Sequence, residues 1–219
     1  MTEDPALPIY NILVIGANGG IGSQAVAIAL KQGHRVTAIL RNPANLGITD
    51  PNLIVAKGDI MKPETLEKHL ENKDAVISAI GKSSMKETRL YSRGNENLLL
   101  AMKKAGTTRV FFISASGLDV NPSHNFFIRL ITKYVLQKIL KNMYADLERM
   151  EKIIKESDRN WTIMRPPQLT NTLLTGRYRF AINGFLKNGL KISRADLAYF
   201  MIDNIANTAI YKTTVEVAY

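Results

Sequence analysis

The chain has 219 residues, of which 46% are hydrophobic and 22% charged, so it is long enough for one globular domain with a sizeable core. It has no cysteine, which excludes disulfides and thiolate chemistry, and its three histidines (His34, His69 and His124) lack the spacing of metal ligands, so we expect no metal site. The net charge of +10 lies mainly after residue 80, but the basic residues are scattered, and we therefore expect no nucleic-acid partner.

The first ten residues, MTEDPALPIY, are polar and contain two prolines, unlike a secretory signal peptide. No apolar run approaches the ~20 residues that a membrane-spanning helix needs. These features predict a cytoplasmic protein without a membrane partner.

A strand, a glycine-rich turn and a helix are predicted near the start of the chain. Residues 11–15 read NILVI and residues 16–22 read GANGGIG, and an apolar helical pattern then runs from Ile21 to Leu30. The turn places backbone N–H groups at a helix N-terminus, where the peptide dipoles favour an anion. Gly16 suits the sharp turn, Gly19 and Gly20 leave the backbone open to a pyrophosphate, and Gly22 permits close packing of helix on strand.

The glycine spacing is GxxGxxG, whereas the best-known dinucleotide fingerprint is GxGxxG. The sequence Gly-Ala-Asn-Gly-x-x-Gly after a first strand resembles the short-chain dehydrogenase/reductase superfamily, in its extended and atypical branches. The resemblance implies that a nicotinamide dinucleotide is bound by Gly16, Ala17, Asn18, Gly19, Gly20, Ile21 and Gly22. A strand-to-helix turn without a ligand is the alternative.

Residues 35–40 and 53–57 are predicted to be the second and third strands. NAD-binding sites usually carry an acidic residue at the end of the second strand, where this chain has Arg41. A guanidinium there suits the 2′-phosphate of NADP, so NADP is favoured over NAD. After the third strand, the resemblance places Asp59 and Ile60 against the adenine, although Asp59 also suits a simple turn.

Residues 74–81 and 109–117 are predicted as the fourth and fifth strands, separated by a helix from about residue 88 to residue 104. Ligands of open α/β sheets bind beyond the carboxyl ends of the strands. Ala79, Ile80 and Gly81 are therefore expected along the ribose and nicotinamide. In many superfamily members a Ser or Thr at the end of the fifth strand bonds the reacting group, so Ser114 and Ser116 are the candidate catalytic residues, with turn capping as the alternative.

A helix is predicted over residues 126–141, where apolar and aromatic residues recur at helical spacing among basic ones. We interpret it as a helix that faces the core or a dimer partner. A lid over an aromatic substrate is the functional alternative.

The helix predicted over residues 144–156 lacks the catalytic Tyr-x-x-x-Lys of the superfamily. In relatives the Lys lies one turn before a helical Glu; Glu151 fits that Glu, but the Lys and Tyr positions hold Leu147 and Met143. Tyr134 and Lys138 spell the motif about nine residues too early, ~13 Å along a helix, and are interpreted as a chance match. Without this pair, the site suits hydride transfer to an acceptor that needs no positioned Tyr acid, such as a flavin, a quinone or a tetrapyrrole.

The remaining chain supplies a sixth strand at 160–167 that ends in Met-Arg-Pro-Pro, a short strand at 173–180, and a helix opened by Ser193 as N-cap with Asp196 at its third position. Together, Arg-Met-x-Lys (149–152), Met-Arg-Pro-Pro (164–167), Leu-Thr-Gly-x-Tyr (174–178) and Ile-Ser-x-x-Asp-Leu (192–197) resemble the biliverdin reductase B and flavin reductase group of atypical short-chain reductases. That group also lacks the Tyr-Lys pair, and the resemblance adds Pro166 to the cofactor site.

These observations predict a single α/β domain over residues 1–219, a doubly wound parallel sheet of Rossmann type, in which residues 166–219 complete the substrate side. The expected function is an NAD(P)H-dependent reductase of flavin-like or other conjugated small-molecule acceptors, as a monomer or homodimer. The alternatives are an NmrA-like sensor that binds NADP without turnover and a sugar-nucleotide epimerase or dehydratase, the latter disfavoured because its base is missing.

Overall fold

The computed structural model describes residues 8–43, 46–81 and 87–219. In chain order the elements are β1 (Asn11–Ile15), α1 (Gly20–Lys31), β2 (Arg35–Leu40), β3 (Leu53–Lys57), η2 (Pro63–Thr65), α2 (Glu67–Leu70), β4 (Ala75–Ser78), α3 (Leu90–Ala105), β5 (Arg109–Ile113), η3 (Ser116–Leu118), α4 (Phe126–Ile131), η4 (Thr132–Leu136), α5 (Gln137–Ile139), α6 (Lys141–Lys155), β6 (Asn160–Met164), β7 (Gln168–Thr170), β8 (Arg179–Ile182), β9 (Lys191–Ser193), α7 (Arg194–Asp203), η5 (Thr208–Ile210) and β10 (Thr213–Ala218).

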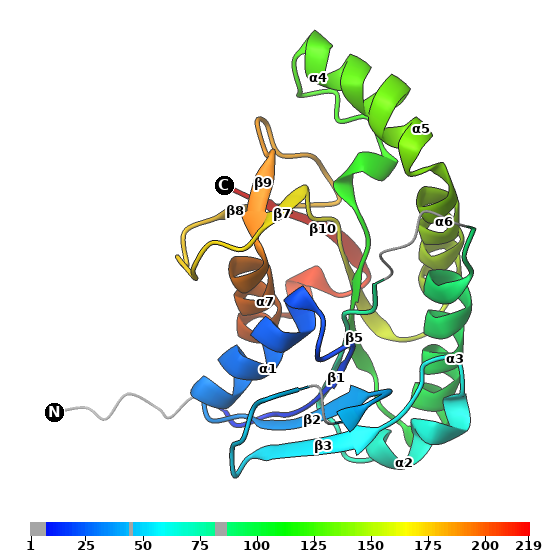
Figure 1. Cartoon of the computed structure of the whole chain (residues 1–219), viewed down its shortest axis with the longest axis vertical. Coiled ribbons are helices and arrows are strands. Elements are labelled where there is room, and N and C mark those ends of the chain that lie inside the picture. Colours follow the sequence, from blue (N-terminus) through cyan, green and yellow to red (C-terminus); the bar gives the residue numbers. More distant parts are fainter. Residues whose placement is uncertain (1–7, 44–45, 82–86) are drawn as a thin grey trace, which may run out of the picture.

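The main sheet has the strand order β3-β2-β1-β4-β5-β6-β10-β8, and every pair in it is parallel except β10 with β8 (Figure 1). The order reverses between β1 and β4, so the connections leaving these two strands diverge at their carboxyl ends. In open α/β sheets this reversal is the place where ligands bind. The prediction of a doubly wound, mainly parallel sheet in a single α/β domain is confirmed.

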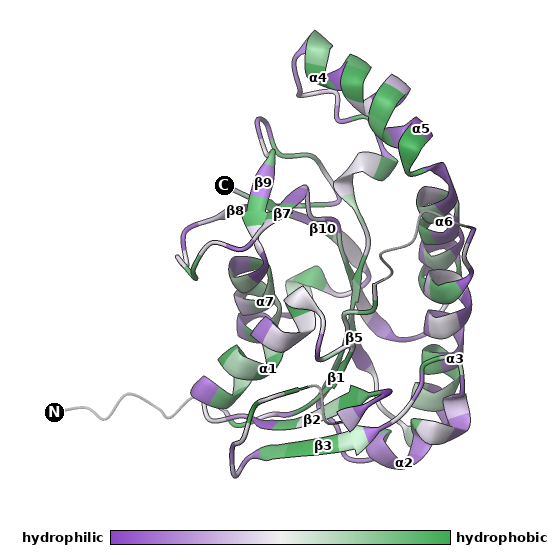
Figure 2. Ribbon diagram, in the orientation of Figure 1, coloured by the Kyte–Doolittle hydropathy of each residue, from purple (hydrophilic) through white to green (hydrophobic). Residues whose placement is uncertain are grey.

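Helices cover both faces of the sheet, with α1 and α7 on one side and α3 and α6 on the other (Figure 1). The strands in the middle of the sheet are mainly apolar, as their green colour in Figure 2 shows, and their apolar side chains are buried in separate cores on the two faces. Side chains alternate between faces along each strand: Ile12 and Val14 of β1 belong to the α1/α7 core, and Leu13 and Ile15 to the α3/α6 core.

The N-terminus of α3 is capped by a residue of α6 rather than by one of its own. Asp146 is fully buried and accepts hydrogen bonds from the backbone N of Tyr91 at 2.9 Å and from the hydroxyl of Ser92. A carboxylate at this position satisfies N–H groups that have no helical partner and complements the helix dipole. This contact fixes α6, and with it Glu151, relative to the sheet.

The strand predicted at 173–180 is wrong in position, because only Arg179–Ile182 form β8. The backbone N–H groups of Thr175 and Gly176 donate to the carboxylate of Asp196, at 3.0 and 2.8 Å, instead of to a neighbouring strand. β7 and β9, which pair with each other in a small parallel sheet, were not predicted. In contrast, the predicted N-cap is confirmed, since the Ser193 hydroxyl accepts from the backbone N of Asp196.

The helix predicted over 126–141 is present as α4, the π-helical η4 and α5, but it does not face the core. Phe126 and Phe127 are 68% and 73% exposed, and Tyr134 is 59% exposed. Figure 2 shows these apolar turns extending beyond the body of the domain. The core-facing interpretation is therefore wrong, while the dimer and lid interpretations stay predictions.

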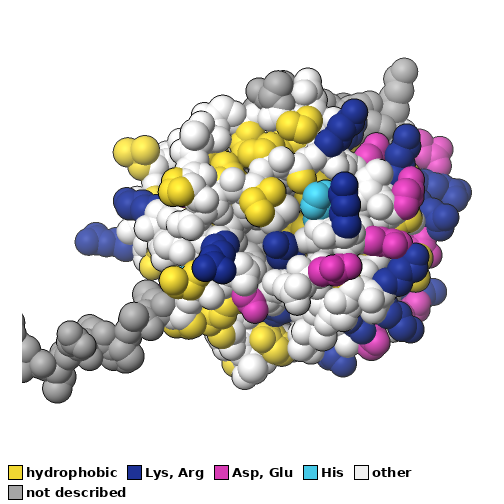
Figure 3. All heavy atoms as spheres, turned by 90° about the horizontal axis from the view of Figure 1, so that it is seen from below, with side chains coloured by type: hydrophobic (Ala, Val, Ile, Leu, Met, Phe, Trp, Pro, Cys, Tyr) yellow, Lys and Arg dark blue, Asp and Glu magenta, His cyan; other side chains and the backbone are white. Residues whose placement is uncertain are grey.

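Charged side chains of both signs cover the surface. On the face shown in Figure 3, Lys and Arg side chains are interspersed with Asp and Glu, and they do not merge into one continuous basic patch. Across the described ranges, no helix combines the length and apolar character needed to cross a membrane. Residues 1–7, on which part of the expectation about the N-terminus rests, lie outside the described residues.

Candidate cofactor and acceptor site

The glycine loop lies at the carboxyl end of β1, against the end of β4. Gly16 has φ +78°, a left-handed conformation, and an added Cβ there would lie 2.5 Å from the carbonyl oxygen of Ala79. A Cβ on Gly22 would lie 2.2 Å from the carbonyl oxygen of Gly16, inside van der Waals contact. Side chains are thus excluded at both positions, and the backbone between them turns tightly into α1.

The first turn of α1 leaves backbone donors without helical partners. Gly19 is the N-cap and provides no side chain, and the first turn contains no acidic residue. The N–H groups of Gly20, Ile21 and Gly22 precede the first internal helical hydrogen bonds, so they can bind an anion. Asn18 is exposed beside them, and Ala17 is fully buried.

Arg194, the first residue of α7, lies over this turn. A Cβ added to Gly20 would lie 2.6 Å from Cδ and 2.7 Å from Nε of Arg194. The end of the Arg194 side chain therefore packs directly on the glycine backbone. Its Nη1 donates to Asn171 Oδ1 at 2.7 Å. A cation from the C-terminal part of the chain therefore stands beside the predicted pyrophosphate position.

The other predicted cofactor residues lie along the same edge of the sheet. Arg41 is exposed directly after β2, and Ala79, buried, donates its backbone N–H to Ile15. Ile80 is half-buried and Gly81 exposed beyond β4, which ends at Ser78, three residues earlier than predicted.

Asp59 forms a turn, since its Oδ1 accepts from the backbone N of Met61 at 3.0 Å. The carbonyl of Ile60 accepts from Asn97 Nδ2 at 3.1 Å, and the Ile60 side chain is buried against Gly94. This is the turn-forming role that the sequence left open for Asp59. An adenine contact through its second carboxylate oxygen stays a prediction.

The two candidate serines have different surroundings. The hydroxyl of Ser114, which is buried, donates to Glu151 Oε1 at 2.7 Å. Ser116 lies at the start of η3, where its backbone N donates to the carbonyl of Pro166 and it lines a cavity. Bonding of the acceptor by Ser114 stays a prediction, but in this structure its proton is already donated to Glu151.

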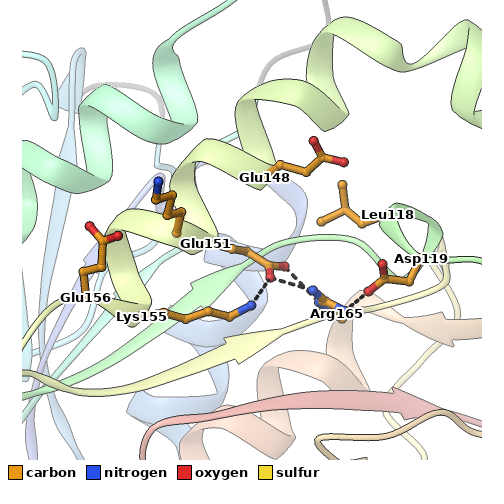
Figure 4. Close-up of a pocket in the computed structure, with 8 residues that line it drawn as sticks. Leu118, Asp119, Glu148, Glu151, Lys155, Glu156 and Arg165 are labelled. Carbon is orange, nitrogen blue, oxygen red and sulfur yellow. Dashed lines mark hydrogen bonds and ion pairs between the residues drawn. The ribbon is translucent and has the colours of Figure 1, made fainter.

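Glu151 is the centre of an ion-pair network that joins α6 to Arg165, directly after β6, and to Asp119, directly after η3 (Figure 4). Arg165 donates from Nε and Nη2 to the two carboxylate oxygens of Glu151, at 2.9 and 2.6 Å, and from Nη1 to the carboxylate of Asp119. Burial alone would raise the pKa of Glu151, but hydrogen bonds and charge from Arg165, with Ser114 and Lys155, outweigh it and hold that pKa below its ordinary value. The network anchors the segment directly after β6, in which Pro166 is buried.

A second cavity of about 200 Å³ lies beside this network, at the carboxyl end of β6 and beside the first half of β10. Its lining comprises Ser116, Asp119, Arg165, Asn183, Gly184, Phe185, Thr214 and Glu216. Glu216 is 3% exposed; its Oε2 accepts from the backbone N of Leu186 at 2.9 Å, while its Oε1 has no hydrogen-bond partner among the described residues. Burial raises the pKa of Glu216 above its ordinary value, although the hydrogen bond from the backbone N of Leu186 and the charge of Arg165 act in the opposite direction.

No Tyr-Lys pair stands at this site in the part of the chain that the structure describes. Tyr134 and Lys138 are exposed on η4 and α5. Tyr144 is buried on α6, where its hydroxyl lies against Gly117, and burial raises its pKa.

The comparisons with known proteins agree with this geometry. The sequence profile of the NAD(P)H-binding family matches residues 16–208, which is most of the chain. The chain belongs to this family. The NAD(P)H-binding domain has the Rossmann fold of the atypical short-chain dehydrogenases/reductases, and the predicted cofactor class is confirmed.

Among sequence relatives, the NAD(P)H-binding domain is 36% identical over 107 residues to the photosystem II assembly factor Ycf39 of Synechocystis, covering 47% of this chain and 33% of that protein. It is 32% identical over 130 residues to isoflavone reductase of Medicago sativa, covering 50% of this chain and 39% of the enzyme. The matched region thus spans between a third and two fifths of these relatives.

Among solved structures, a Streptococcus pneumoniae protein provisionally described as an NADH-flavin reductase has a TM-score of 0.76 and 25% identity, covering 95% of this chain and 99% of that one. A short-chain dehydrogenase/reductase of Veillonella parvula in complex with NADP has a TM-score of 0.78 at 18% identity, covering 97% and 95% of the two chains. The latter likeness is one of fold.

The residues present fit a bound NAD(P)H. Backbone atoms leave no room for a side chain at Gly16 or Gly22, so the loop stays tight. The N-terminus of α1, which has no capping side chain, lies at the edge of the sheet where the strand order reverses. The sequence reasoning missed Arg194 and Glu216. Glu216 had a usable signal, because it is the one charged residue inside the apolar run TTVEVAY.

We expect Arg194→Gln to weaken NADPH binding about tenfold, because the side chain keeps its length but loses the positive charge beside the phosphate position. Titration by cofactor fluorescence measures this. Arg35→Gln, at the exposed opposite end of the sheet, serves as the control and should leave the affinity unchanged. Equal affinities for the Arg194→Gln protein and the wild type would show that Arg194 only packs on Gly20.

Proposed function

We propose that this protein is an NADPH-dependent reductase of flavin-like or other flat, conjugated acceptors. The observation that carries the proposal is the bare N-terminus of α1 at the switch point of the sheet, with Arg41 at the end of β2 in place of the acidic residue that favours NAD. The name of the Streptococcus pneumoniae structure supports flavin-like acceptors, and isoflavone reductase among the relatives supports conjugated ones.

The chain binds and orients the reactants. The N–H groups of Gly20, Ile21 and Gly22 hold the pyrophosphate, Arg41 takes the 2′-phosphate, and Ala79 to Gly81 lie along the ribose and nicotinamide. The chemistry supplied by the bound cofactor is hydride transfer. The site has no Tyr-Lys pair to protonate a simple alcohol product, so it suits acceptors whose reduced form is stabilised by conjugation.

The test combines turnover with binding. Consumption of NADPH, followed by its absorbance, is measured with FMN and with a quinone, beside a titration of NADPH in the absence of an acceptor. Saturable consumption with either acceptor supports the proposal. Tight binding without turnover on any acceptor contradicts it and favours a sensor.

The preference for NADP is tested by Arg41→Asp. Because the substitution removes a cation and introduces a carboxylate that suits ribose hydroxyls, we expect NADPH affinity to fall about 100-fold while NADH affinity changes by less than about threefold. The two affinities are measured by titration under identical salt conditions. An equal loss for both cofactors would contradict the assignment of Arg41 to the 2′-phosphate.

A second candidate is an NADP sensor that conveys cofactor occupancy to a partner protein. It is favoured by the exposed apolar surface of α4, η4 and α5, in which Phe126 and Phe127 are more than two-thirds exposed. An epimerase or dehydratase activity is disfavoured, since Met143 and Leu147 occupy the positions of its base.

A further inference from the structure

The cavity between β6, β10 and the turn at 183–185 is lined by a buried glutamate, one carboxyl oxygen of which has no hydrogen-bond partner among the described residues. Glu216 projects from the sheet on the face opposite to Val215 and Val217, which belong to the α1/α7 core. Its Oε2 is held by the backbone N of Leu186, and its Oε1 is buried with no partner among the described residues. An unpaired buried polar atom is costly, and because Glu216 lines the cavity, a small turn of its carboxyl group toward a ligand there would give Oε1 a partner.

The charged groups around the cavity affect the pKa of Glu216. Arg165 and Asp119 line the cavity with Glu216, whereas Glu151 and Lys155 line the neighbouring groove beyond Arg165. The guanidinium of Arg165 already donates to both oxygens of Glu151 and to Asp119, so its charge is compensated. Burial therefore outweighs the hydrogen bond from the backbone N of Leu186 and the charge of Arg165, and it raises the pKa of Glu216 above its ordinary value, the direction that favours a protonated carboxyl group.

The position of the cavity connects it with the predicted chemistry. Ser116, a candidate catalytic residue at the start of η3 shortly after β5, lines it together with Glu216 on β10. β10 lies two strands from β5 in the sheet, about 10 Å at the usual strand spacing, on the side away from the glycine loop. A volume of about 200 Å³ is below the range of about 300–1,000 Å³ for drug-sized ligands, so the cavity has room for one end of such a molecule and not for the whole of it.

We propose that this cavity receives the uncharged carbonyl end of the acceptor and that Glu216 is its hydrogen-bond and proton donor, a role that rests on the proposed reductase function. Hydride addition to the conjugated acceptor places negative charge on that carbonyl oxygen. The O–H bond of Glu216 then breaks, its proton forms the new O–H bond of the product, and the carboxylate takes a proton back from water. NADPH is oxidised by two electrons and the acceptor is reduced by two. Glu216 gives its proton directly to the carbonyl oxygen of the conjugated acceptor, in a site that has no Tyr-Lys pair.

The first test measures binding of menadione, a neutral quinone, to the NADP⁺-loaded protein across pH. Wild-type affinity should fall by up to tenfold per pH unit once Glu216 ionises, because only the neutral acid can donate to the carbonyl. Glu216→Gln keeps a donor that does not titrate, so its affinity should be independent of pH. Glu64→Gln, an exposed position beyond the opposite edge of the sheet, should behave as the wild type. The same pH dependence in Glu216→Gln as in the wild type would overturn the proposal.

The second test separates binding from proton transfer. Glu216→Gln should lower kcat with menadione about 100-fold while KM changes by less than about threefold, since the amide binds the carbonyl but does not transfer a proton. A kcat within twofold of the wild type would overturn the role of Glu216 while leaving the reductase function in place.

A third measurement uses only the wild-type protein, so it does not require that the Glu216→Gln variant folds. Infrared difference spectra of the wild-type protein, with and without menadione, should show a shift of a protonated carboxyl C=O band, and the absence of such a band would overturn the proposal. The band shift without NADPH consumption on any acceptor would support the cavity as a carbonyl site and contradict the reductase function, so the two failures are distinguishable.

Discussion

Gly22→Ala is expected to remove NADPH binding at any practical cofactor concentration and to lower the free energy of unfolding by about 3 kcal/mol. The added Cβ would lie 2.2 Å from the carbonyl oxygen of Gly16, and neither group belongs to a flexible side chain. The only relief is a movement of α1 away from β1, which displaces the N–H groups of Gly20 and Ile21 from the pyrophosphate. We expect the affinity loss to exceed about 100-fold.

Urea unfolding and cofactor titration together check this expectation. Ala27→Ser, at an exposed position of the same helix, also adds one heavy atom to α1 and should change neither quantity measurably. If Gly22→Ala bound NADPH as tightly as the wild type, the close approach of helix and loop would not be what shapes the cofactor site.

We expect Asp196→Asn to lower the free energy of unfolding by about 2–4 kcal/mol, the largest loss for a substitution in the C-terminal part of the chain. Asp196 is fully buried and accepts from the backbone N–H groups of Thr175 and Gly176 and from the hydroxyls of Ser193, Thr175 and Tyr219. An asparagine replaces one acceptor oxygen with a donor in front of groups that also donate. The segment around Thr175, which carries Asn171 toward Arg194, should then loosen.

The loss should depend on pH in a defined direction. Burial raises the pKa of Asp196, but the hydrogen bonds from Tyr219, Ser193, Gly176 and Thr175 outweigh it and hold that pKa below its ordinary value. The stabilisation is therefore present above the carboxyl's unfolded-state pKa and disappears as pH falls through the folded-state pKa. Urea unfolding between acid and neutral pH should show the difference between wild type and Asp196→Asn shrinking on acidification.

The matched control is Asp203→Asn, the same change at an exposed position of the same helix. It should cost less than about 0.5 kcal/mol at every pH. A comparably small effect of Asp196→Asn would mean that the loop at 171–178 is held by other contacts.

The sequence by itself determined the features that are written in short, contiguous patterns. The strand, glycine turn and helix over residues 11–31 follow from an apolar β-branched run, glycines where no Cβ fits, and helical periodicity, all of which act within a few residues. Ser193 with Asp196 three residues later specified a helix N-terminus for the same reason.

Only the tertiary structure decided how distant residues share the site. It paired Ser114 with Glu151 and placed Ser116 beside the cavity. It also brought Arg194 onto Gly20 and buried Glu216 in the wall of that cavity. The residues around Thr175 do not form the predicted strand, because their N–H groups donate to the carboxylate of Asp196 instead of to a neighbouring strand. Local patterns set the backbone conformation of each segment. The partner of a buried polar group, in contrast, depends on which segments lie side by side, and the strand order of the sheet decides this.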